Sequence, residues 1–119
     1  MGYKITGETI QLTRGDSFYC VVGLVSQEDK QPYTPVEGDV VRFALKRDIL
    51  IPGGGEFVDQ TPLLTKVIPN DTLLLHLLPS DTKNLHFGTY IYDVEIEFSD
   101  GEVATFIGPA PFILGKEVD

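Results

Sequence analysis

The chain has 119 residues, of which 18 are acidic and nine are basic, so that its formal net charge is −9 at pH 7. A chain of this length forms one domain around one core, and nine scattered cations exclude the basic surface that nucleic acids require. The single cysteine excludes a disulfide framework, and no apolar run reaches the roughly 20 residues of a membrane-spanning helix. We therefore expect neither a nucleic-acid nor a membrane partner.

Apolar side chains alternate with polar ones along most of the chain, which is typical of β-strands. The predicted strands are, in chain order, residues 9–13, 17–25, 40–46, 63–68, 72–77, 89–98, 102–107 and 112–114. One short helical turn is predicted near 79–85, where Pro79 precedes two candidate capping residues, Ser80 and Asp81. Seven or eight antiparallel strands without a long helix predict an all-β sandwich of two packed sheets.

The sandwich is expected to be a single domain that spans residues 1–119. An N-terminal arm at 1–7 precedes the first strand, and a tail at 115–119 follows the last one. Residues 47–61 are expected to form a long flexible loop. They include a proline followed by three glycines, and glycine loses the most conformational entropy when it is ordered.

The strongest turn signal is the Asp-Gly pair at 100–101, because both residues tolerate the positive φ angles of a two-residue hairpin. The resulting register pairs Phe98 with Val103, Ile96 with Thr105 and Val94 with Ile107. This register turns Ile91 and Phe106 towards the outside of the sheet. An outward Phe106 is either covered by a neighbouring loop or part of a contact patch for another subunit.

A second apolar stretch, at 72–78, contains five leucines and is too apolar for a strand with one solvated face. Both faces of this strand are therefore expected to be covered. The predicted interface residues of the chain are Ile91, Phe106, Leu74 and Leu78.

Asp93, Glu95 and Glu97 project from one face of the strand at 89–98, and residues 84–115 contain five acids but no Lys or Arg. We expect one strongly acidic face. It either keeps the protein soluble and its sheet edges unpaired or attracts a basic partner. The flat row lacks the spacing of a calcium loop, so we predict no metal site there.

We predict no catalytic residue, cofactor or metal, and hence no enzyme. His76 and His86 have no Cys or His at metal-ligand spacing. Cys20 lies in an apolar strand, where burial raises the pKa of a thiol and makes it unreactive. The tripeptide at 14–16, Arg-Gly-Asp, matches an integrin-binding motif by its letters, but we interpret it as a turn whose charged side chains are solvated.

Part of the chain resembles the sixth-strand signature of immunoglobulin-like sandwiches, through Asp81, Leu85, Gly88, Tyr90 and Tyr92. The resemblance implies that Tyr90 is a structural corner residue whose hydroxyl binds nearby backbone, and that Tyr92 replaces a core cysteine of antibody domains. It also implies that Cys20 occupies the position of the partner cysteine. A sandwich without the disulfide suits synthesis in a reducing cytoplasm.

Four motifs cover most of the chain between about residues 8 and 114. They are LTRGDSF at 12–18, YTP at 33–35 with GDVVRF at 38–43, PSDT at 79–82 with GTY at 88–90, and YDVEI at 92–96. Together they are similar to a family of small immunoglobulin-like structural proteins of phages and prophages of Gram-positive bacteria. Among named proteins, the chain resembles the N-terminal module of phage baseplate upper proteins.

This resemblance implies a non-catalytic structural module of a phage tail, baseplate or head. It would act through contacts with itself, as an oligomer, or with other virion proteins, and would be found in the virion or, before assembly, in the host cytoplasm. The alternative is a ligand- or glycan-binding sandwich that uses the loop at 48–61 and the tyrosines Tyr3 and Tyr33, because sandwich folds often carry such sites.

Overall fold

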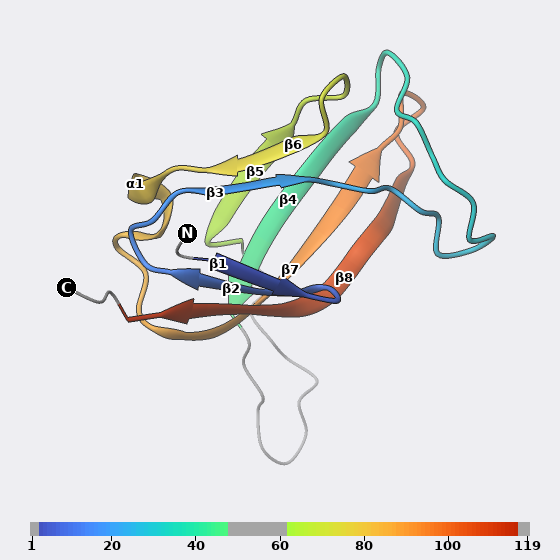
Figure 1. The fold of residues 1–119 in the computed structure, drawn as a ribbon. Helices are drawn as coiled ribbons and strands as arrows, with labels where there is room; N and C mark the ends of the chain where they lie inside the picture. The colour runs from blue at the N-terminus through green and yellow to red at the C-terminus, as the bar shows by residue number, and fades with distance from the viewer. Residues whose placement is uncertain (1–2, 48–61, 117–119) are drawn as a thin grey trace.

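The structure, a computed structural model, describes residues 3–47 and 62–116. Its described part contains eight strands and one short helical turn (Figure 1). They are β1 (Tyr3–Thr6), β2 (Thr9–Thr13), β3 (Phe18–Val21), β4 (Val40–Arg47), β5 (Leu64–Ile68), β6 (Leu74–Leu77), α1 (Pro79–Thr82), β7 (Gly88–Glu97) and β8 (Val103–Gly115). The mainly-β fold and the helical turn that the sequence predicts are confirmed.

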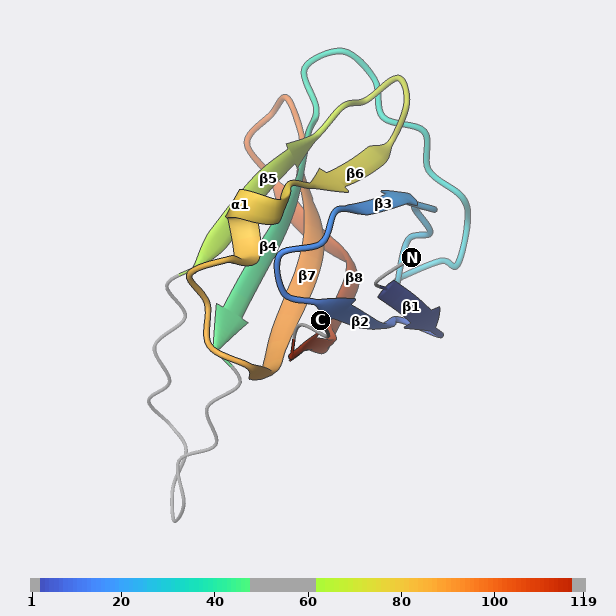
Figure 2. The same ribbon diagram turned by 60° about the vertical axis from the view of Figure 1, so that its left-hand side comes forward.

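The strands form two sheets, which lie as two layers in Figures 1 and 2. One sheet has six strands in the order β1-β2-β8-β7-β4-β5, and the other consists of β3 and β6. Neighbouring strands are antiparallel except for β2 and β8, which are parallel and pair Leu12 with Leu114. The prediction of a wholly antiparallel sandwich is therefore wrong at this pair. Parallel strands need a long connection, and here the rest of the domain supplies it.

Two segments differ from the predicted strands. Tyr3–Thr6, which the sequence places in an N-terminal arm, pairs with β2 as a strand. The two predicted strands at 102–107 and 112–114 are one continuous strand, β8. The predicted loop at 47–61 lies outside the described residues except for Arg47, which ends β4, and the predicted tail is described only at Gly115 and Lys116.

The β7–β8 hairpin has a different register at its turn from the predicted one. Glu97 faces Val103, so the loop has five residues, and the amide of Phe98 donates to the carbonyl of Glu102 at 2.8 Å. The predicted pair Phe98–Val103 is therefore wrong, and so is Ile96–Thr105, because Ile96 faces Ala104. An odd loop shifts every pair by one residue.

Beyond the first register shift, Val94 faces Ile107 as predicted. A second irregularity follows between Tyr92 and Val94. The chain there requires glycine at position 108, since its φ is +85° and a β-carbon would lie 2.5 Å from the carbonyl oxygen of Tyr92. This second irregularity shifts the register by one more residue, so that Tyr90 faces Phe112.

The core lies between the two layers. Its largest fully buried side chains are Phe18, Phe43, Phe112, Leu12, Leu45, Ile68, Leu77, Ile96 and Leu114. Phe106 also belongs to it, with only 7% of its surface exposed, and its ring centroid lies 5.5 Å from that of Tyr33. The prediction that Phe106 faces outward is wrong, because Thr105 takes the outward place opposite Glu95. Tyr33 packs against Phe106 at the edge of the core, so neither alternative applies, because both placed Phe106 on the outside of the sheet.

Candidate functional site

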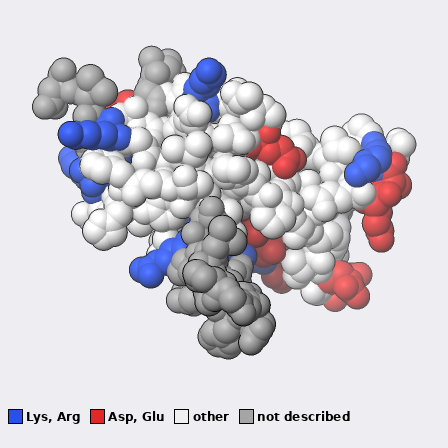
Figure 3. Space-filling view, turned by 90° about the horizontal axis from the view of Figure 1, so that it is seen from below, with Lys and Arg blue, Asp and Glu red and all other residues white. Residues whose placement is uncertain are grey.

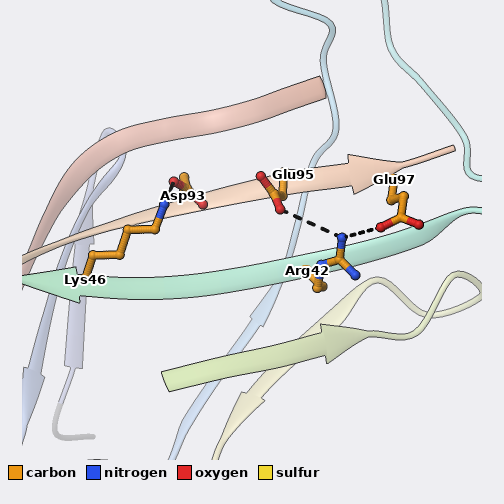
Figure 4. Close-up of polar contacts among 5 residues, drawn as sticks. All are labelled: Arg42, Lys46, Asp93, Glu95 and Glu97. Atoms are coloured by element: carbon orange, nitrogen blue, oxygen red, sulfur yellow. Dashed lines mark hydrogen bonds and ion pairs between the residues drawn. The ribbon is translucent and has the colours of Figure 1, made fainter. Parts of the chain in front are cut away.

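The outer face of the six-stranded sheet carries a row of ion pairs between β4 and β7 (Figure 4). Arg42 Nη2 donates to Glu97 Oε1 at 2.8 Å and lies 3.9 Å from Glu95 Oε1. Lys46 Nζ donates to Asp93 Oδ2 at 3.2 Å, with 19% and 14% of the two side chains exposed. Each cation reaches diagonally to an acid of the neighbouring strand, a spacing that long side chains span.

These pairs correct the expectation of one strongly acidic face. The three acids of β7 are those predicted, but β4 lies beside β7 and supplies two cations. Arg42 is shared by Glu95 and Glu97, and Lys46 pairs with Asp93. The face is therefore a mixed surface of both signs. The more exposed pair, Arg42–Glu97, contributes little to stability, about 0.2–1 kcal/mol. Together the pairs leave little net charge for attracting a basic partner.

The outer face of the β3–β6 layer has a different character. The side chains that alternate outward are Tyr19 and Val21 on β3 and Leu74 and His76 on β6. Tyr19 is 45% exposed and Val21 is 69% exposed, and the rings of Tyr19 and His76 stack at a centroid distance of 4.2 Å. Leu78, 43% exposed, continues the row past the end of β6. We call these five residues the apolar face; none of them is Asp, Glu, Lys or Arg.

The four predicted interface residues do not form one surface. Leu74 and Leu78 belong to the apolar face, whereas Ile91 lies half-buried on the opposite side of the sandwich, across from Lys46. Phe106 lies in the core. The sequence analysis missed Tyr19 and Val21 as members of a surface. Their outward alternation with Phe18 and Cys20 was the available signal.

The predicted corner contact of Tyr90 is present, because its hydroxyl donates to the carbonyl of His86 at 2.6 Å. Burial raises the pKa of this hydroxyl. Burial, followed by the charge of Glu8, also raises the pKa of Tyr92 to about 12, and the Tyr92 hydroxyl donates to the carbonyl of Glu8. Both phenols therefore stay protonated at neutral pH and act as structural donors.

A third tyrosine holds the loop that packs against Phe106. The hydroxyl of Tyr33 donates to Asp39 Oδ2 at 2.5 Å, and the same oxygen accepts the amide of Val36 at 3.0 Å. The bond to the carboxylate raises the pKa of Tyr33 to about 12 and lowers that of Asp39. Tyr3 is also engaged, since its ring packs edge-on against Phe18 at a centroid distance of 4.8 Å. Neither Tyr3 nor Tyr33 is an open stacking platform.

The segment Arg14–Asp16 forms the predicted turn, with Gly15 at a φ of +86°. Its arginine is not simply solvated, because Nη1 donates to the carbonyl of Leu85 at 3.3 Å and the guanidinium lies 4.2 Å from the centroid of the Phe87 ring. The turn also donates the amide of Gly15 to the buried hydroxyl of Thr82 in α1. The turn therefore binds residues 82–87, which are distant from it in sequence, and its arginine is engaged within the protein.

Three further residues lie as follows. His76 is on the apolar face, His86 is exposed in the loop before β7, and Cys20 packs against the core, where burial raises the pKa of its thiol. In residues 3–47 and 62–116, no three His, Cys, Asp or Glu side chains are placed to share a metal ion, and no helix there is long and apolar enough to cross a membrane.

No family model matches the chain, and no match is found among curated proteins or solved structures. The function therefore has to be inferred from the faces and contacts of this molecule.

Proposed function

We propose that the chain is a non-catalytic assembly module that associates with a second copy of itself through the apolar face, and that it serves as a structural component of a phage or prophage particle. The phage assignment rests on the sequence resemblance. The assembly role is carried by one observation, the uncharged outer face of the β3–β6 layer.

The finer fold that we propose is an immunoglobulin-like sandwich. In such folds one sheet follows the strand order G-F-C-C′ and the other contains B beside E. The order β8-β7-β4-β5 beside the pair β3–β6 supports this assignment, if β3 to β8 are B, C, C′, E, F and G. The hydrogen bond of Tyr90 to the carbonyl of His86 supports it as well, because a corner tyrosine belongs at the start of strand F.

The apolar face supports self-association for an electrostatic reason. Two copies with a net charge of −9 repel one another over most of their surfaces. At the apolar face, Tyr19, Val21 and Leu74 bring no formal charge into contact, so that burying them gains hydrophobic free energy without desolvating an ion. The buried tyrosine hydroxyls and the carboxylate of Asp39 all hold the layers and loops together, which supports a structural role over a catalytic one.

Two matched variants test the face. Val21 lies on it and is 69% exposed, whereas Val67 lies on β5 of the other sheet and is 66% exposed. We expect Val21→Glu to convert the oligomer to a monomer in size-exclusion chromatography with light scattering, and Val67→Glu to leave the oligomer intact. A wild-type chain that stays monomeric at several hundred micromolar, or an oligomer lost only in Val67→Glu, contradicts the proposal.

The place in a phage particle needs a separate test. Mass spectrometry of purified particles from an induced lysogen should detect the chain at a stoichiometry comparable with that of tail or head proteins. Its absence from the particles, with the chain present in the lysate, rejects the virion assignment while leaving the oligomer untouched.

A further inference from the structure

A hollow of about 660 Å³ opens at the end of the sandwich, where β4 ends and β7 begins. Its polar lining residues include Arg47, Asn84, His86 and Thr89, and Phe87 and Leu63 add apolar surface. Phe87 is 46% exposed and Leu63 is 37% exposed. Small-molecule sites have volumes of roughly 300–1,000 Å³ and combine apolar walls with a few polar groups. The hollow fits that description.

The cation of the hollow is Arg47, and its position is fixed by the pairing of β4 with β7. Arg47 lies opposite Tyr90 in the β4–β7 register, and its positive charge acts on the Tyr90 hydroxyl, where it opposes the effect of burial. Among the described residues, Arg42, Lys46 and Lys66 each have a carboxylate partner, whereas Arg47 has none. None of the described residues that line the hollow is Asp or Glu. An arginine so placed is available to an outside anion.

Two carbonyl groups in the wall formed by residues 85–87 already accept hydrogen bonds from side chains. The carbonyl of Leu85 accepts from Arg14, and the carbonyl of His86 accepts from Tyr90 at 2.6 Å. The guanidinium of Arg14 also lies over the Phe87 ring. Carbonyl oxygens would repel an anion, and the engagement of these two reduces that repulsion. Side-chain donors to the hollow are available from Arg47, Asn84, His86 and Thr89.

The charge distribution over the surface agrees with this. In Figure 3, seen from below, Lys and Arg lie mainly towards the side that carries α1 and the C-terminal end of β8, whereas Asp and Glu lie mainly towards the opposite side. The loop that leads into β7 starts on the cationic side (Figure 1). A local excess of cations raises the concentration of anions even where the protein as a whole is negative.

We propose that this hollow binds a small organic oxyanion, a single carboxylate or phosphate group on a body about the size of one sugar ring, with Arg47 as the principal ligand of the anion. A guanidinium offers two parallel donors to either group, and Phe87 and Leu63 supply the surface against which the body packs. The site shares no residue with the apolar face, so its test does not depend on the proposed assembly role.

The test uses the full-length chain, labelled with nitrogen-15, in two-dimensional NMR titrations. Glucuronic acid and glucose 6-phosphate are the probes, with neutral glucose and inorganic phosphate as references. We expect shifts concentrated at Arg47 and at residues 84–90, and affinities for both probes at least tenfold tighter than for either reference. Arg47→Gln should weaken glucuronic acid binding about tenfold or more, and Arg47→Lys should weaken it less, because the charge is kept while the paired donors are lost.

Lys30→Gln is the matched control, because it removes the same charge from an exposed residue outside the lining of this hollow. It should change the affinity less than twofold. The proposal would be overturned if glucose bound as tightly as the two probes, or if Arg47→Gln and Lys30→Gln lost affinity equally. It would also be overturned if the chemical-shift changes occurred at all basic residues instead of at residues 84–90. Phosphate alone binding as tightly as glucose 6-phosphate would overturn it too, because the hollow would then not recognise the body. An unchanged NMR spectrum away from the site checks that each variant is folded.

Discussion

On the outer face of the six-stranded sheet, cations of β4 meet acids of β7, whereas the outer face of the β3–β6 layer has only aromatic and aliphatic side chains. Both faces belong to strands whose inner side chains pack against the same core. The difference shows that an outward position in this fold is not made polar merely by being outward. The outward charges of β4 and β7 lie where each has a partner of opposite sign on the neighbouring strand. The outer face of the β3–β6 layer has no such pairs, and its apolar side chains are exposed.

The largest expected effect is on the free energy of unfolding, and it distinguishes a core residue of β6 from the exposed residue that follows it. Leu77 of β6 is fully buried, whereas Leu78 just beyond it is 43% exposed. We expect Leu77→Ala to lower the free energy of unfolding by about 2–5 kcal/mol, from lost burial and the cavity left behind. Leu78→Ala should change it by no more than about 0.5–1 kcal/mol. Urea unfolding of both variants, followed by circular dichroism, checks this. Similar losses of unfolding free energy in the two variants would contradict the prediction and mean that Leu78 is buried in solution.

A smaller effect is expected on the charged face. Asp93→Asn leaves the ammonium of Lys46 without its partner, and both side chains are more than four-fifths buried. The cost should be about 1–2 kcal/mol, between that of exposed and fully buried pairs. Glu97→Gln, at a side chain 45% exposed, should cost less than about 1 kcal/mol. Chemical unfolding measures both, and the reverse order would show that Asp93 is stabilised independently of Lys46.

The third prediction concerns pH and the loop that packs against Phe106. The bond from Tyr33 lowers the pKa of Asp39 in the folded chain. The stability this gives is complete above about pH 4, the pKa of the carboxyl in the unfolded chain, and is lost as the pH falls through the lower folded pKa. We expect the thermal midpoint to fall in acid, and to fall less in Tyr33→Phe, which lacks the donor. Parallel acid profiles of the two proteins would assign the loss to other carboxyl groups.

At high pH the same bond acts in the opposite direction. The pKa of Tyr33 is raised to about 12, so the stability it contributes is complete below about pH 10, the pKa of an unfolded tyrosine, and is lost as the pH rises towards 12. Tyr33→Phe should remove this part of the alkaline decrease, which ultraviolet absorbance and circular dichroism can follow together.

The smallest expected effect is that of salt on self-association, and it distinguishes the apolar face from the charged β4–β7 face as the site of contact. If copies meet through the apolar face, salt screens the repulsion between their net charges, and raising sodium chloride from about 0.05 M to about 0.5 M should tighten the oligomer a few-fold. Contact through complementary charges of the β4–β7 face would weaken over the same range. Sedimentation velocity at the two salt concentrations decides between these results.

The elements that the sequence predicts correctly depend on local patterns. The alternation around Ile10 and Leu12 gives β2 with its predicted bounds, and Phe18 and Val22 are buried while Tyr19 is exposed. The resemblance to immunoglobulin-like sandwiches implies that the Tyr90 hydroxyl binds nearby backbone, and the contact found, with the carbonyl of His86, spans only four residues. Such features are predictable because strand periodicity and short-range hydrogen bonds are properties of consecutive residues.

The features that were missed depend on distant segments. Arg42 and Glu97 are 55 residues apart, so the sequence shows an acidic strand but not the cations beside it. The Asp-Gly turn signal is real, yet the loop has five residues, because Phe98 bonds to Glu102 and Asp100 accepts the amide of Glu102 at 2.9 Å. Because five is an odd number and the predicted two is even, the pairing shifts by one residue, which turns Phe106 inward, where Tyr33 packs on it.

The amino-acid sequence by itself determined that the chain is a β-rich domain with one short helical turn, and which side chains of β2, β3 and β7 face its core, because alternation is a local property of an extended chain. Only the tertiary structure decided which strands are neighbours, and with that which charges are paired, which apolar residues remain outside, and where Arg47 stands beside Tyr90. Pairing between distant strands depends on the whole set of packing contacts, which no single segment encodes.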